Sequence, residues 1–246
     1  MIYLIGDTQS KENVKNPLVV IAHHICDLRP KHVLHLGDHW DMPSLSAYDK
    51  GKKSHRVYSY LKDIEAGNLA MREFWNIINL RWPKWKDECV FVILEGNHEN
   101  RRNNALEYGG DYIYDLLASK SFDLKNWSIK VPFLEVIKIN GIEFSHYFQN
   151  DGSPRPIGTA KQLLTKRHVS CIAGHKQGFD YAEMLKGADE TIQSMIIGSS
   201  YYHNESYKTH TNHHWRGTVL IHFREGAAGF DFSRYSLESL DKIYDL

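Results

Sequence analysis

The sequence predicts an α/β fold, and three observations point to it. The chain begins with a strand, a helix and a second strand, short apolar runs that end at glycine recur along it, and a hairpin follows in its second half. A strand–helix–strand unit implies parallel strands joined by a right-handed crossover. The chain has 246 residues, of which 42% are hydrophobic and 24% are charged, so we expect 1–246 to form a single globular domain.

The first half of the chain alternates strands with helices. Short apolar runs closed by glycine are typical of buried strands. Asn16 can cap the first helix, Pro17 suits its first turn, and Arg29-Pro30 ends it. The predicted elements are strand Ile2–Ile5, helix Pro17–Leu28, strand His32–Leu36, helix Tyr60–Leu80 and strand Val90–Leu94.

The second half is richer in strands. Asn140-Gly141 is a strong two-residue turn signal between two apolar runs, which predicts a hairpin. Two stretches, 42–88 and 100–130, are longer than plain connections need, and we expect insertions there that could form a partial lid. The remaining predicted elements are helix Asp111–Ser119, strands Val136–Ile139 and Ile142–Ser145, helix Pro156–Arg167, and strands Val169–Ala173, Ile192–Ile197 and Thr218–Phe223.

Composition excludes several classes of protein. Lys plus Arg and Asp plus Glu both number 30, so the chain lacks a global basic field for holding nucleic acid. Cys26, Cys89 and Cys171 lie far apart in or beside apolar runs and form no CxxC motif, which indicates buried, reduced thiols and no cysteine zinc site. The N-terminus does not read as a signal peptide, and no segment reaches the length of a membrane span. We expect a cytoplasmic protein that does not contact a membrane.

Residues with ligand-type side chains fall where the predicted strands end. Asp7, Asp38 and Asn97 follow the first three strands, His146 closes the second hairpin strand, and His175 follows a later strand. All of them except His146 come directly after a glycine at the end of a predicted strand. In open α/β sheets, ligand sites gather at the carboxyl ends of the strands. Five oxygen or nitrogen donors at one edge are what a metal cluster needs.

Each of these residues has an ordinary structural explanation when taken alone. An Asp after a strand often caps the next helix, an Asn is common in turns, and a lone His is more often a core or surface residue than a ligand. Taken together, in this order, they favour a metal site.

The order of the motifs resembles the calcineurin-like metallophosphoesterase family. That family shows Asp-x-His after the first strand, then Gly-Asp-x-x-Asp, Gly-Asn-His-Asp/Glu, a lone His, and Gly-His-x-His. The middle two motifs match fully, the first and last match in part, and the resemblance spans residues 1 to about 178. It implies a two-sheet mixed β-sandwich flanked by helices in four layers. The matching residues are Asp7-Thr8-Gln9, Gly37-Asp38-His39-Trp40-Asp41, Gly96-Asn97-His98-Glu99, His146 and Gly174-His175-Lys176-Gln177.

The resemblance implies two divalent metal ions. Asp38 would bridge them, Asp7 would bind one, and Asn97, His146 and His175 would bind the other. A hydroxide shared by the two metals would attack phosphorus in line, while the metals neutralise charge on the phosphoryl oxygens.

His98 and Asp41 are the catalytic residues that the resemblance implies. His98 would not be a metal ligand; it would assist the leaving oxygen as general acid or donate to the phosphoryl oxygens. Asp41 would hold and polarise His98.

Two departures from the family concern one of the two metals. The family has histidines where this chain has Gln9 and Gln177. Amide oxygens are harder and less basic than imidazole, so we expect Mn²⁺ or Mg²⁺ at this position and weaker affinity. The other position could hold Mn²⁺, Fe²⁺ or Zn²⁺; Ni²⁺ is also possible, and Mn²⁺ is favoured overall. The alternative is that Gln177 is not a ligand and that this metal is partly lost.

Arg101, His39 and His203 are the candidate substrate-binding residues. Arg101 follows His98 closely, and an Arg fork suits phosphate oxygens; a solvated pair with Arg102 is the alternative. His39 lies inside a motif and could flank the substrate. His203 begins the histidine-rich segment His203–Trp215, which could supply substrate contacts or an extra metal site, or form a polar surface loop.

These observations predict a metal-dependent phosphoesterase acting on a phosphomonoester or phosphodiester. A nuclease acting on DNA or RNA is an alternative, which the basic run Lys50–Arg56 favours and the zero net charge disfavours. A second alternative is a non-catalytic metal-binding module on the same fold, which the retained His98 and Asp41 disfavour. A nucleotide binder is disfavoured because no GxGxxG follows the first strand. The sequence does not determine the oligomeric state.

Overall fold

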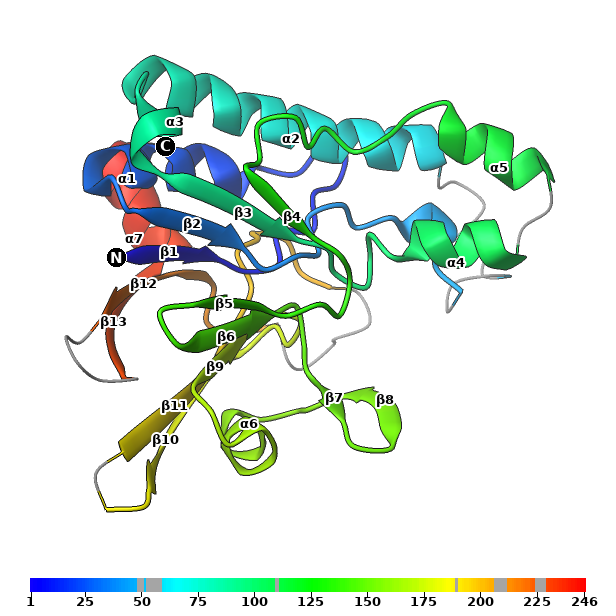
Figure 1. The fold of residues 1–246 in the computed structure, drawn as a ribbon. Helices are drawn as coiled ribbons and strands as arrows, with labels where there is room; N and C mark the ends of the chain where they lie inside the picture. Colours follow the sequence, from blue (N-terminus) through cyan, green and yellow to red (C-terminus); the bar gives the residue numbers. More distant parts are fainter. Residues whose placement is uncertain (48–50, 52–58, 109–110, 189, 206–211, 224–228) are drawn as a thin grey trace.

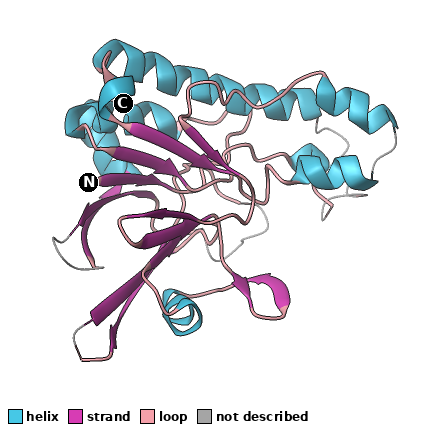
Figure 2. Ribbon diagram, in the orientation of Figure 1, coloured by secondary structure: helices cyan, strands magenta, loops and turns pink. Residues whose placement is uncertain are grey.

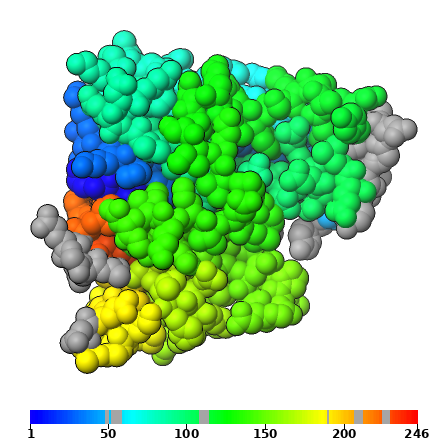
Figure 3. Space-filling model, viewed as in Figure 1, coloured from blue at the N-terminus to red at the C-terminus, as the bar shows by residue number. Residues whose placement is uncertain are grey.

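The computed structural model describes residues 1–47, 51, 59–108, 111–188, 190–205, 212–223 and 229–246. Two main mixed sheets pack face to face, and helices flank them (Figures 1 and 2). This arrangement confirms the predicted α/β class and the two-sheet sandwich. In the space-filling view, the helical layer and the second sheet form one continuous body on the face shown (Figure 3).

The first sheet has six strands in the order β13-β12-β1-β2-β3-β4. Strands β1 to β4 are parallel, and β12 and β13 extend the sheet in antiparallel fashion. Ile5 pairs with His35, and His35 pairs with Ile93, so the first three strands end level with one another. The strands are β1 (Ile2–Ile5), β2 (His32–His35), β3 (Val90–Leu94), β4 (Ile129–Val131), β12 (Gly217–Phe223) and β13 (Phe230–Ser236).

The second sheet has five strands in the order β10-β11-β9-β6-β5. Strands β6, β9 and β11 are parallel, and Ala173 of β9 pairs with both Ser145 and Ile196. A separate two-stranded ribbon, β7 and β8, follows β6 along the chain. The bounds are β5 (Ile137–Ile139), β6 (Ile142–Ser145), β7 (Gln149–Asn150), β8 (Ser153–Pro156), β9 (Cys171–Ala173), β10 (Phe179–Lys186) and β11 (Glu190–Ile197).

Three apolar cores separate four layers. Tyr3 and Ile5 of β1 pack toward the helices, whereas Ile2 and Leu4 pack between the two sheets, so both faces of this strand are buried. A third core lies between the second sheet and one helix and includes Leu163. The layers are therefore helices, sheet, sheet and helix. The outer helices are α1 (Pro17–Leu28), α2 (Tyr60–Arg81), α3 (Trp85–Glu88) and α7 (Leu237–Tyr244) over the first sheet and α6 (Ala160–Arg167) over the second.

Most predicted elements are confirmed, with one clear correction. Helix α6 begins at Ala160 rather than at Pro156, because residues 153–156 form β8 and the Thr159 side chain caps the helix by accepting from the Gln162 N–H. The three cysteines are buried free thiols, as expected. In the described part of the chain, no helix has both the length and the apolar character needed to cross a membrane.

The two long segments proposed as insertions contribute helices. Helix α2 lies within 42–88 and buries Met71, Phe74 and Trp75 in the helical core, so it belongs to the domain. Segment 100–130 carries α4 (Arg101–Tyr108) and α5 (Asp111–Ala118), which lie beyond the carboxyl ends of the strands in Figure 1. A lid role for the rest of these segments stays a prediction.

Candidate metal centre

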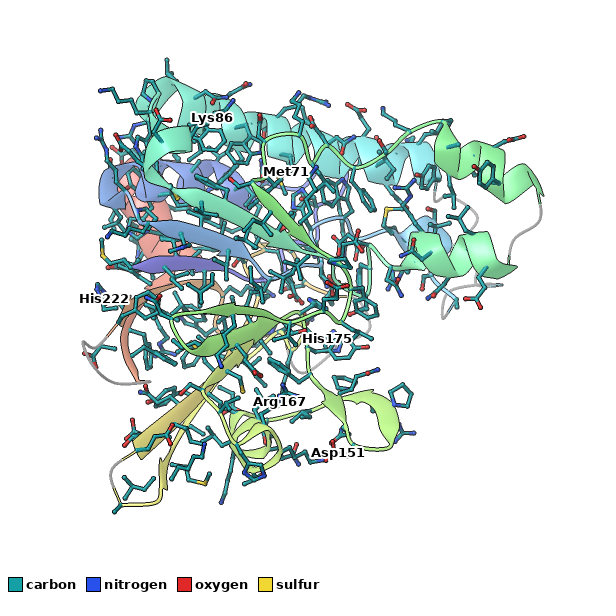
Figure 4. All side chains as sticks on the ribbon, in the orientation of Figure 1. Met71, Lys86, Asp151, Arg167, His175 and His222 are labelled. Carbon is teal, nitrogen blue, oxygen red and sulfur yellow. The ribbon has the colours of Figure 1, made fainter. Side chains whose placement is uncertain are left out.

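The predicted ligands gather at the edge where the strands of both sheets end. Figure 4 shows the labelled His175 at this edge, where loops from the two sheets meet, far from the two termini. Glycines allow the close approach. A Cβ on Gly96 would lie 2.0 Å from Asp38 Oδ1, and one on Gly37, where φ is +97°, would lie 2.8 Å from His146 Nδ1. Gly37 and Gly96, which begin the second and third motifs, are therefore needed to bring the donors together.

Four residues form the more compact half of the centre, which we call the histidine side: Asp38, Asn97, His146 and His175. Asn97 Oδ1 lies 2.7 Å from His175 Nδ1 and 3.0 Å from His146 Nε2. His146 Nε2 lies 3.4 Å from Asp38 Oδ1. Ligand atoms of Asp38, His146 and His175 all lie within 4.8 Å of one another. These residues form a cluster that could hold one metal ion.

A hydrogen bond at Nδ1, the ring nitrogen that faces away from the centre, fixes the orientation of His146. Its Nδ1 lies 2.7 Å from the carbonyl oxygen of Leu36, and a carbonyl oxygen only accepts, so Nδ1 carries the proton and donates it. In the neutral ring, Nε2 then presents its lone pair to the centre. A second hydrogen bond of this kind is usual for histidines that bind metals.

Asp38 and His146 stabilise each other's charged forms. Burial alone would raise the pKa of Asp38, but His146, His98 and His175 hold it well below its usual range. Burial alone would lower the pKa of His146, but Asp38 raises it to about 9. A buried carboxylate here requires a nearby positive charge, which protonated His146 supplies when no metal is bound. A divalent cation would supply that charge instead.

Asp7, Gln9 and Gln177 are the residues predicted to bind the second metal, and we call them the glutamine side. Asp7 Oδ1 accepts a hydrogen bond of 3.1 Å from the His175 N–H. Asp7 Oδ2 is buried and has no hydrogen-bond partner among the described residues. Burial is the main cause that raises the pKa of Asp7 to about 7, and the negative charge of Asp38 is the second cause. Two buried carboxylates that interact electrostatically, one of them with an unpaired oxygen, favour a bound cation.

A cavity of about 510 Å³ opens on the centre. Gln9 and Gln177 line it together with Asp38, His98 and His175. The donor set is thus oxygen and nitrogen on the histidine side and oxygen on the glutamine side, both of which suit divalent metal ions.

The two predicted catalytic residues lie beside Asp38. His98 Nδ1 is 3.0 Å from Asp41 Oδ1, and His98 Nε2 is 3.8 Å from Asp38 Oδ2. Burial lowers the pKa of His98, but Asp38 and Asp41 outweigh it, so this pKa lies above its usual value. His98 therefore contacts Asp41 through Nδ1 and directs Nε2 toward the centre.

Arg101 is brought to the site, next to His98. Its guanidinium donates to the carbonyl oxygens of Asp41 at 2.8 Å and Met42 at 3.1 Å, and to His98 Nε2 at 3.2 Å. Arg101 therefore holds the turn after the second motif against His98. Its contact with a phosphate stays a prediction.

His39 does not belong to the site, which corrects the prediction that it flanks the substrate. Its side chain is fully buried; Nδ1 lies 2.6 Å from Thr8 Oγ1, and Nε2 lies 2.9 Å from the carbonyl oxygen of Gly67. Both ring nitrogens are thus bound inside the protein.

His203 lies in a different cavity, about 500 Å³ in volume, that shares Gln9 with the first. Its Nε2 is 2.7 Å from Glu205 Oε1, and its ring stacks on Tyr201 with centroids 4.3 Å apart. A contact between His203 and the substrate stays a prediction. Residues 206–211 of the histidine-rich segment and all of the basic run 50–56 except Gly51 lie outside the described residues.

Glu99 is a site residue that the sequence analysis did not assign. Its buried carboxylate accepts from the N–H groups of Asp38 at 2.9 Å, His39 at 2.6 Å, Trp40 at 2.9 Å and Gly96 at 2.8 Å. These bonds stabilise the turn in which Asp38 has a φ of +54°. The acidic position of the third motif was the signal that could have identified it.

Comparisons with known proteins leave the family of this chain unassigned. No protein-family model matches it. The Gene 54 protein of Mycobacterium phage L5 is 24% identical over 208 residues, which cover 80% of this chain and 78% of that protein. A crystal structure of wild-type Vps29 complexed with Zn²⁺, from Entamoeba histolytica, has 12% sequence identity and a TM-score of 0.43, covering 96% of this chain and 98% of that one. The function is therefore inferred from the site itself.

Proposed function

We propose that this chain is a metal-dependent phosphoesterase of the metallophosphoesterase type that hydrolyses a phosphomonoester or phosphodiester. One observation carries the proposal: the four donors of the histidine side converge beside a histidine that is paired with a buried aspartate. Asp38, Asn97, His146 and His175 would hold one divalent ion. Asp7, with Gln9 and Gln177, would hold a second that shares Asp38. Mn²⁺ suits both donor sets, with Mg²⁺, Fe²⁺, Zn²⁺ or Ni²⁺ as alternatives.

Metal ions bound there would neutralise phosphoryl charge and lower the pKa of water. The chain itself supplies the proton chemistry. His98 lines the cavity, and its Nε2 faces Asp38. Arg101 occupies this nitrogen only while the ring is neutral, so protonation of His98 would displace the guanidinium and leave the Nε2–H free to donate to the leaving oxygen. Asp41 holds the opposite ring nitrogen and stabilises the protonated ring. Arg101 contacts His98, and its guanidinium would turn to a phosphoryl oxygen when His98 is protonated.

A small ester fits the cavity better than a nucleic acid does. Among the described residues that line it, the only lysine or arginine is Lys176, whose ammonium donates to the Gly158 carbonyl oxygen at 2.6 Å. A dedicated nuclease needs several cations along the nucleic-acid backbone. The non-catalytic alternative leaves the pairing of His98 with Asp41 without a role.

The test is hydrolysis of p-nitrophenyl phosphate and bis(p-nitrophenyl) phosphate by chelator-stripped protein with Mn²⁺ added. We expect activity only with metal, and a loss of about 10²-fold in His98→Ala. His23→Ala is the matched control, because His23 bonds Arg81 on α2, away from the centre. The preferred ester distinguishes a phosphatase from a diesterase. Full metal binding with no hydrolysis of either ester would contradict the proposal and favour the non-catalytic module.

A further inference from the structure

Lys11 lies between the catalytic pair and the histidine-rich segment. Its Nζ is 2.8 Å from Glu205 Oε1 and 3.4 Å from Asp41 Oδ2. The side chains of Asp41 and Glu205 are only 11% and 8% exposed, and that of Lys11 is 27% exposed. One ammonium group thus bridges two nearly buried carboxylates from distant parts of the chain.

The two oxygens of Asp41 have different partners. Oδ1 lies 3.0 Å from His98 Nδ1, whereas Oδ2 faces Lys11. Glu205 is itself fixed, because its N–H donates to Asn212 Oδ1 at 2.9 Å and its carboxylate pairs with His203 Nε2 at 2.7 Å. A continuous line of charged and polar groups therefore connects His98 to His203.

Arg101 cannot take over the role of Lys11. The hydrogen bonds that its guanidinium makes to Asp41 reach the backbone carbonyl oxygen and not the carboxylate. Without Lys11, Asp41 Oδ2 would lose its cation and would face the like charge of Glu205 across the gap that Lys11 fills. A buried carboxylate in that position is free to rotate away from its histidine partner.

We propose that Lys11 is a positioning residue: its ammonium group, anchored by Glu205, fixes the Asp41 carboxylate so that His98 keeps its ring aimed at the leaving oxygen. This inference rests on the proposed phosphoesterase function and extends it to residues outside every recognised motif. Lys11 acts through Asp41 and does not contact the phosphate.

The kinetic test compares Lys11→Met, Lys11→Arg and Lys15→Met on phenyl phosphate and 2,4-dinitrophenyl phosphate, or on the matching diesters. Lys15 is the matched control, because both lysines line the cavity that contains His203, but Lys15 pairs with Asp241 at 2.9 Å. For the phenyl ester, we expect Lys11→Met to lower kcat about tenfold with little change in KM. The dinitrophenyl ester needs little proton donation, so its kcat should change much less. Lys11→Arg should restore most of the loss, and Lys15→Met should resemble the wild type.

A double mutant separates positioning from substrate binding. In a His98→Ala background, Lys11→Met should cause no further loss, because its effect passes through His98. An equal loss on both esters, a rise in KM, or a loss that persists in that background would overturn the proposal and assign Lys11 to the substrate.

A spectroscopic readout does not depend on activity. The Nδ1–H signal of the His98 ring, assigned by its loss in His98→Ala, should be sharp and slow to exchange in the wild type, Lys11→Arg and Lys15→Met, and broadened in Lys11→Met. An unchanged signal in Lys11→Met would overturn the positioning role. A broadened signal in a protein that hydrolyses no ester would support the positioning of His98 by Lys11 while contradicting the phosphoesterase function.

Discussion

The two sides of the candidate metal centre share one edge of the fold but offer different donors. The histidine side combines two imidazoles with a carboxylate and an amide oxygen, whereas the glutamine side has a carboxylate and two amides. Asp38 lies between them: its Oδ1 is 3.4 Å from His146, and its charge raises the pKa of Asp7. The strand ends therefore determine where the donors lie, whereas the residue types at positions such as 9 and 177 determine which metal ions the donors would prefer.

The two sides also differ in how they are held. On the histidine side, His146 directly follows β6, and the Leu36 carbonyl fixes its ring. On the glutamine side, Gln9 lies in a loop with a φ of +37°, and its N–H donates to the Asp38 carbonyl oxygen at 2.9 Å. We therefore expect the histidine side to bind metal more tightly, both because imidazole is the better donor and because its donors are preorganised.

Removing the shared charge should have the largest effect, since it affects both sides. Asp38→Asn keeps the side-chain shape but removes the carboxylate that the two metals would share. We expect kcat/KM for ester hydrolysis to fall by about 10³-fold and bound metal to fall on both sides. Elemental analysis of dialysed protein, with Asp27→Asn on the surface as control, checks this. Full metal content in Asp38→Asn would refute the shared role.

Single changes on each side should differ in size. We expect His146→Ala to lower activity by about 10²-fold and Gln177→Ala by less than about tenfold, because an imidazole ligand contributes more than an amide. The measurement is kcat/KM at saturating Mn²⁺, together with the metal content of each variant. Equal losses in the two variants would remove the distinction between the sides.

Replacing the two glutamines with histidines should make the glutamine side bind metal more tightly. Gln9→His with Gln177→His supplies the residues that the resembling family has, and His tolerates the left-handed backbone at position 9. We expect the dissociation constant of the weaker Mn²⁺ or Zn²⁺ site to fall by about tenfold or more. The dissociation constant of the stronger site should not change. Calorimetric titration of stripped protein measures both constants. An unchanged weak constant would mean that these positions are not ligands.

The smallest effect on the metal centre is expected at His39, which lies beside Asp38 in sequence but belongs to neither side; its effect is on the stability of the fold. Burial lowers its pKa from 6.5 to about 4, so the unfolded chain binds a proton more readily than the folded one. This part of the stability is complete above about pH 6.5 and is lost as pH falls toward 4, on the order of 3 kcal/mol. In denaturant unfolding, the wild type should lose more stability than His39→Gln over that range. If the free energy of unfolding fell equally with pH in the two proteins, His39 could not be buried in its neutral form.

The strand ends could be predicted because their signal is local. Strands β1 and β3 have the bounds expected from sequence, because apolar runs closed by glycine determine them. The glycine before Asn97 is needed because Asp38 Oδ1 lies where its side chain would be. A motif of this kind records a steric requirement within a few residues.

Other features depended on contacts between distant segments and could not be predicted. Lys11 and Glu205 are separated by 194 positions, and no spacing rule pairs them. His39 was wrongly expected at the substrate because the turn at Asp38, whose φ is +54°, directs the next side chain into the core. The late start of α6 has the same origin, since β8 exists only by pairing with β7.

Metal-dependent hydrolysis at this centre can be tested by one titration that follows Mn²⁺ binding and ester hydrolysis in the same chelator-stripped sample. We predict that hydrolysis rises along the binding curve of the metal centre and disappears again when chelator is added. Hydrolysis that is independent of bound Mn²⁺, or saturated binding without hydrolysis of either ester, would contradict it.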